Sequence, residues 1–67
     1  MKLTIREFLD FLNAIKPNIE DEEALDLVEE NVKQWSEIGR YPPFMDKEFE
    51  FNDGAVLALL PYYKENV

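Results

Sequence analysis

The residues of this 67-residue chain that could do chemistry are its carboxylates, because it contains 15 aspartates and glutamates but no histidine and no cysteine. Two carboxylates support acid–base catalysis when their environments separate their pKa values. The chain has little polar context for that purpose, since it contains only one serine (Ser36) and one threonine (Thr4). A chain of this length is also not expected to enclose a substrate pocket of several hundred Å³. We therefore expect a protein that is not an enzyme.

Acidic and polar residues alternate over 46–52, which is superficially similar to a calcium-binding loop. An EF-hand loop beginning at Asp46 would need glycine at its sixth position and glutamate at its twelfth. Phe51 and Leu57 stand at those positions. The usual zinc ligands, thiolate and imidazole, do not occur in the sequence. The sequence predicts no bound metal and no cofactor.

The carboxylates are concentrated in one segment of the chain. Residues 20–37 contain eight acids and one base, Lys33, so they carry −7 of the net charge of −8. With 3.6 residues per helical turn, six of these acids share the face opposite Leu25, Val28 and Trp35. We call this set the acidic stripe: Glu22, Glu23, Asp26, Glu29, Glu30 and Glu37. Its charge density, roughly one per 4 Å of helix, is comparable with that of a DNA strand.

Two interpretations of the acidic stripe are open. It is either a solvated face that keeps a small protein soluble, or a surface that docks on a basic groove of a partner protein, as a nucleic-acid mimic would. Net charge disfavours direct binding to nucleic acid or to an anionic membrane. Our functional hypothesis is a small regulator or inhibitor that docks on a basic surface of a partner protein, for example a surface that normally binds nucleic acid. Its predicted contacts on the stripe are Glu22, Asp26, Glu29, Glu30 and Glu37.

The segment from Arg40 to Met45 combines a cation, two aromatic rings and a diproline. Tyrosine and arginine are enriched in binding hot spots, so Tyr41 and Phe44 are further candidate contacts, unless they fold back over the core. The alternative function is a structural or assembly protein that homo-oligomerises, as a homodimer for example, through apolar aromatic surface. That surface would use Tyr41, Phe44, Tyr62 or Tyr63.

Two amphipathic helices are expected to carry these residues. Thr4 and Glu7 have the spacing of a capping box, and Pro17 should end the first helix, which we place at 5–16. The second helix is expected over 20–38, capped by Asn18 or Asp21, with Gly39 just beyond its end. The apolar stripes of both helices predict a shared core that includes Trp35 and the phenylalanines.

The third segment is ambiguous. Ala55 to Leu60 are good helix formers ahead of Pro61, but Asn52-Asp53-Gly54 could instead turn a β-hairpin over 47–60. Either element is apolar nearly all round and is expected at the buried centre. We predict a mainly α fold: one small acidic domain over 1–67 with three helices, or with the hairpin in place of the third. With no cysteine, signal peptide or membrane span, a cytoplasmic location is expected.

Overall fold

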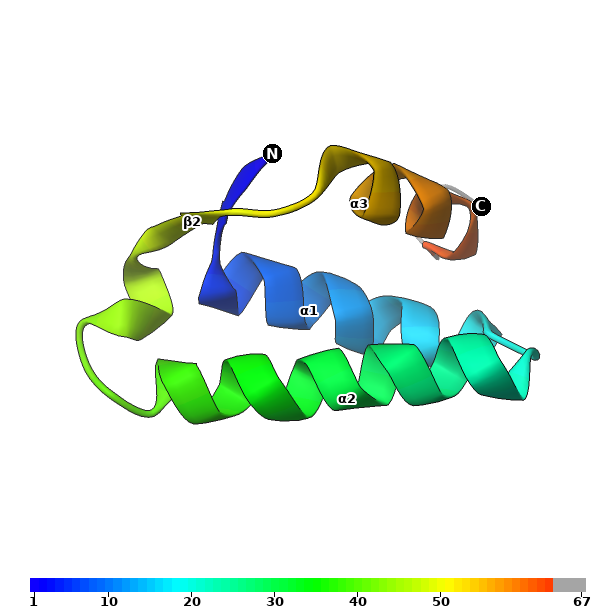
Figure 1. Ribbon diagram of the computed structural model, residues 1–67, viewed down its shortest axis with the longest axis horizontal. Helices are drawn as coiled ribbons and strands as arrows, with labels where there is room; N and C mark the ends of the chain where they lie inside the picture. The colour runs from blue at the N-terminus through cyan, green and yellow to red at the C-terminus, as the bar shows by residue number, and fades with distance from the viewer. Residues whose placement is uncertain (64–67) are drawn as a thin grey trace.

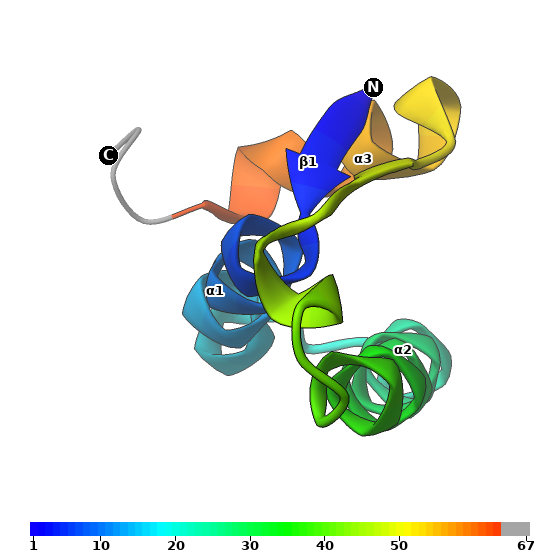
Figure 2. The ribbon, with the colours of Figure 1, turned by 90° about the vertical axis from the view of Figure 1, so that its left-hand side faces the viewer.

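The computed structural model describes residues 1–63, which form three α-helices and a two-stranded antiparallel sheet. The elements follow in the order β1 (Lys2–Thr4), α1 (Ile5–Ile15), α2 (Glu22–Gly39), β2 (Glu48–Glu50) and α3 (Asp53–Leu59), with 3₁₀ turns η1 (Lys16–Asn18), η2 (Phe44–Asp46) and η3 (Leu60–Tyr62). The mainly α prediction is confirmed. Figure 1 shows α1 alongside α2, and the view along these helices in Figure 2 shows α1, α2 and α3 at the corners of a triangle. Within residues 1–63, no helix is both long and apolar enough to cross a membrane.

The start of α1 is held by the predicted capping box. The Thr4 hydroxyl accepts a hydrogen bond from the Glu7 amide at 3.0 Å, and the Glu7 carboxylate accepts one from the Thr4 amide at 2.9 Å. The helix ends at Ile15, one residue earlier than predicted, because the chain tightens into η1 around Pro17. This geometry turns one apolar face of α1 into the core.

α2 begins at Glu22 rather than at residue 20, and Asp21 is its cap, accepting a hydrogen bond from the Glu23 amide. Gly39 does not lie beyond the helix as predicted; it is the last, buried residue of α2 and has ordinary right-handed geometry. A Cβ added there would lie 2.8 Å from the Cε of Met45, the flexible end of that side chain, which would have to move.

The ambiguous third segment contains a helix, α3, so the hairpin alternative is wrong. Asn52 caps α3 by accepting a hydrogen bond from the Ala55 amide. The Phe49 segment does form a strand, but β2 pairs with β1 at the other end of the chain, with Leu3 opposite Phe49 (Figure 2). The expected burial of α3 is also wrong, since only Val56 is buried and Leu57 is 54% exposed.

One apolar core joins these elements. Its buried members are Phe8, Leu12, Ile15, Ile19, Val28, Phe51 and Val56. Phe51 stacks on the Phe8 ring at 4.1 Å between centroids and also contacts Trp35 at 4.7 Å. Trp35 itself is only partly buried, because its other side lines an open hollow between α2 and α3. Phe51 thus connects the chain after β2 to both long helices.

The amino group of Met1 ties β1 to the start of α3. It donates hydrogen bonds to the Glu50 carboxylate at 2.9 Å, to the Phe51 carbonyl at 3.0 Å and to the Asp53 carboxylate. The hydrogen bond to Asp53, followed by that to Glu50, raises the pKa of this ammonium group above its usual value of 8.0. The charged form is therefore favoured by folding.

For the 67-residue chain with a free Met1 amino group, we expect stability to fall as the pH rises above 8. A raised folded-state pKa stabilises the fold fully below the unfolded-state value, and this contribution is lost as the pH passes through the folded-state value. The measurement is the urea midpoint between pH 7 and 9, below the range where lysines and tyrosines titrate. The chain acetylated at Met1 is the control, and a midpoint that falls equally in both proteins would contradict the prediction.

Candidate protein-binding surfaces

The acidic stripe lies on α2, and all six of its side chains are exposed. The ion pairs among residues 1–63 are elsewhere: Met1 with Glu50 and Asp53, and Arg6 with Asp46. Lys33, which lies within the stripe, forms no ion pair in the described part of the chain. The carboxylates of the stripe therefore face solvent without a cationic partner from residues 1–63.

The polar contacts of the stripe are weak. The Gln34 amide donates to the Glu30 carboxylate at 3.4 Å, near the limit of a hydrogen bond. Glu22 and Glu23 lie in the first turn of α2, where the helix dipole favours negative charge. Glu30 and Glu37 lie farther along the helix and gain no such benefit, because the dipole effect fades after the first turn. The predicted contacts on α2 thus share one open face.

Tyr41 and Phe44 lie in the connection between α2 and β2. Tyr41 is 68% exposed, so it does not fold back over the core. Phe44 is 37% exposed and partly covered: its ring lies 6.5 Å from that of Phe49, and the Lys47 ammonium lies 5.7 Å from both rings. These two candidates therefore lie at one end of α2, beyond Glu37, and not along the stripe.

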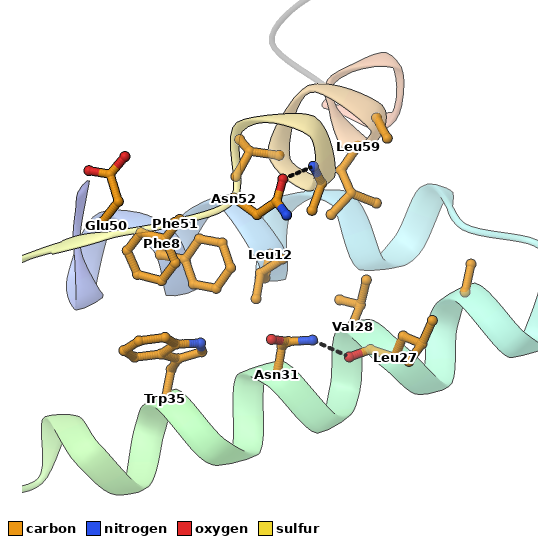
Figure 3. A pocket seen from close by; sticks show the side chains of 14 residues that line it. Phe8, Leu12, Leu27, Val28, Asn31, Trp35, Glu50, Phe51, Asn52 and Leu59 are labelled. Carbon is orange, nitrogen blue, oxygen red and sulfur yellow. Dashed lines mark hydrogen bonds between the residues drawn. The ribbon is translucent and has the colours of Figure 1, made fainter. Parts of the chain in front are cut away.

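Sequence reasoning missed an apolar groove of about 440 Å³ between α2 and α3. We call it the α2–α3 groove. Figure 3 shows Trp35, Asn31 and Leu27 along the α2 side, with Leu59 and Asn52 on the opposite side. The groove is lined by Phe8, Leu12, Ala24, Leu27, Val28, Asn31, Trp35, Glu50, Phe51, Asn52, Ala55, Val56, Ala58 and Leu59. A hollow of this size was not expected in so short a chain; it is present because α3 stands away from α2 and leaves it open to solvent.

The groove presents apolar surface to water. Leu27 is 64% exposed, and Ala55 and Ala58 of α3 are exposed as well. The few polar groups are mostly occupied: the Asn31 amide donates to the Leu27 carbonyl at 2.9 Å, and Asn52 caps α3. The sequence did contain a signal for this face. Leu27 lies outside the apolar stripe that faces the core, but it is four residues before Asn31 and eight before Trp35, so the three side chains share one side of the helix.

The described residues hold no group of three or more histidine, cysteine, aspartate or glutamate side chains placed to bind a metal ion. The groove itself contains a single ionisable side chain, Glu50, whose carboxylate accepts a hydrogen bond from Met1. Comparison with known proteins finds no matching family model, curated protein or solved structure. The described residues thus present exposed negative charge along the stripe and exposed apolar side chains in the groove.

Proposed function

We propose that this protein is a non-enzymatic binding module that regulates or inhibits a partner protein by docking on its basic surface. One observation supports this function: the acidic stripe is exposed along α2, and residues 1–63 supply it with no ion pair. A basic groove that normally holds nucleic acid would meet a similar density of negative charge here. Such complementarity speeds association and makes it sensitive to salt.

Solubility alone explains the stripe less well. Asp26 has Glu22 four residues before it and Glu30 four residues after it, and each such like-charge pair destabilises a helix by a few tenths of a kcal/mol. A solubilising face can mix lysines with glutamates and avoid this cost. The only base among residues 20–37 is Lys33. The retained like charges are better explained by a partner that supplies the positive charge.

The test is capture of partners from a nuclease-treated lysate, with elution by a salt gradient. We expect basic proteins that are released at moderate salt, and we expect their loss when Asp26, Glu29 and Glu30 are all changed to lysine. The fold should persist, because all three side chains are exposed and surface substitutions usually change stability by no more than about 0.5 kcal/mol each. Circular dichroism checks this.

A matched control makes the same change in net charge away from the stripe. Asp10→Lys, Glu20→Lys and Glu48→Lys also replace three exposed acids. This variant should capture the same proteins as the unmodified chain. If both triple variants lose them equally, net charge and not the stripe is responsible; if neither loses them, docking through the stripe is wrong.

The alternative function, self-association through aromatic surface, has weaker support. Tyr41 and Phe44 lie beyond the C-terminal end of α2, whereas η3 with Tyr62 lies near the opposite end of the molecule (Figure 1). Tyr63 is partly buried against the Phe11 ring, 5.5 Å away. These rings do not form one continuous patch. Capture of only further copies of this chain, retained at high salt, would favour this alternative.

A further inference from the structure

We propose that the α2–α3 groove binds an amphipathic helix of the partner protein, a helix whose apolar face is flanked by lysines or arginines. This inference deepens the proposed function and rests on it for the positive charge of the partner. It adds the form of the partner segment and the place where that segment docks. The groove, rather than the acidic stripe alone, is then the specific part of the interface.

The apolar lining indicates what the groove excludes from water when it is occupied. Its floor is made by Phe8 and Leu12 of α1 together with Phe51, and its α2 side carries the exposed Leu27 (Figure 3). Trp35 adds an aromatic side chain whose indole N–H makes no hydrogen bond within residues 1–63. Exposed apolar side chains gathered in a hollow, in place of single scattered ones, are typical of interaction sites.

The walls of the groove indicate a helix as the occupant. Two helices border it, and an amphipathic helix that lies in such a groove places side chains at i, i+3, i+4 and i+7 against its floor. Addition of a strand needs a free sheet edge, and β1 and β2 are each only three residues long. The polar groups that a strand would pair with are therefore few, whereas apolar contact surface is plentiful.

Charge complementarity indicates that this helix is basic. Glu23 and Glu30 are exposed and lie four residues before and three residues after Leu27, so both are neighbours of this groove-lining leucine on the surface of α2. Glu50 lines the groove near the end of β2. A second copy of this chain would bring another acidic stripe to the same place, at a net charge of −8 per chain. Like-charge repulsion disfavours that occupant.

The experiment uses an 18-residue leucine–lysine peptide with leucines at i, i+3, i+4 and i+7 spacing and no aromatic residue. Trp35 is the only tryptophan of the chain and lines the groove, so its emission reports occupation directly. A scrambled peptide of the same composition keeps the charge and loses the apolar face. We expect the amphipathic peptide to shift the Trp35 emission to shorter wavelength and to bind about tenfold more tightly than the scrambled one.

Two exposed leucines provide a matched pair of variants. Leu27→Gln alters the groove and should weaken binding of the amphipathic peptide about tenfold, the equivalent of one leucine contact. Leu57→Gln alters the outer side of α3, which does not line the groove, and should change binding less than about twofold. Ala58→Gln, on the α3 wall, provides a second, independent obstruction. Binding that ignores Leu27→Gln and Ala58→Gln, or that favours the scrambled peptide, overturns the inference.

The charge-reversed variant with lysine at 26, 29 and 30 separates this inference from the proposed function. If this variant binds neither peptide while Leu27→Gln still binds both, the proposal of a basic partner is supported and the proposal that the groove binds its helix is wrong. If it binds both peptides as tightly as the unmodified chain, then the proposed function, docking of positive charge on the acidic stripe, is wrong. Loss of the amphipathic peptide in both variants supports the two proposals together.

Discussion

Replacement of Leu12 by alanine is expected to lower the free energy of unfolding by about 3–5 kcal/mol. Leu12 is 1% exposed and lies in the centre of α1, where it belongs to the single apolar core. Its side chain is buried in the floor of the α2–α3 groove, so its removal leaves a hollow that the neighbouring elements fill only in part. Domains of this length are stable by only about 3–10 kcal/mol in total. The loss is therefore expected to leave a large fraction of the chains unfolded.

Urea unfolding followed by circular dichroism measures this effect. The control is Leu57→Ala, which removes the same atoms from a leucine that is 54% exposed on α3. Because that side chain is largely in water already, its loss should cost about 0.5 kcal/mol or less. Equal costs at residues 12 and 57 would mean that burial in this structure does not describe the folded state.

The features that were predictable from the sequence depend on residues close together in the chain. Thr4 and Glu7 are three residues apart, and their reciprocal hydrogen bonds are present. Asp21 was one of two candidate caps for the second helix and does cap α2. Asn52 likewise caps a third helix. Local hydrogen bonds and apolar periodicity decide such elements, so a single sequence contains the information.

The features that were not predictable depend on distant parts of the chain. Leu3 and Phe49 face each other across the sheet, and nothing in either segment specifies the other as its partner. The pairing of β1 with β2 also explains why the hairpin over 47–60 is wrong: the strand at Phe49 is satisfied by the N-terminal segment. Gly39 shows the same limit, because its contact with the Met45 side chain arises only after the chain has folded back.

The candidate surface divides in the same way. The acidic stripe follows from helical periodicity alone, and its side chains are exposed in the structure. The α2–α3 groove depends on how far α3 stands from α2. That distance is set by the core around Phe51 and Val56 and cannot be predicted from the periodicity of the sequence. The error about α3 and the omission of the groove have one cause: α3 rests on the core through Val56 and leaves its exposed alanines beside an open space.

Replacement of Phe51 by alanine is expected to lower the free energy of unfolding by about 3–5 kcal/mol as well. The Phe51 ring contacts Phe8 of α1 at 4.1 Å and Trp35 of α2 at 4.7 Å between centroids. These contacts hold the segment that contains β2 and α3 on the helix pair. Phe51→Leu is the matched control: it keeps most of the apolar volume and removes the ring contacts, which are worth about 0.5–1.5 kcal/mol each beyond burial.

The Phe51 variants also test whether the molecule unfolds as one unit. Circular dichroism follows mainly α1 and α2, and Trp35 emission follows the contact between α2 and Phe51. We expect the two probes to give the same transition, because Phe51 belongs to the one apolar core that the two long helices share. Separate transitions would mean that residues 48–63 detach while α1 and α2 stay paired. Phe51 also forms part of the groove floor. If the transitions are separate, Phe51→Ala should abolish binding of an amphipathic helix under conditions where α1 and α2 are still paired.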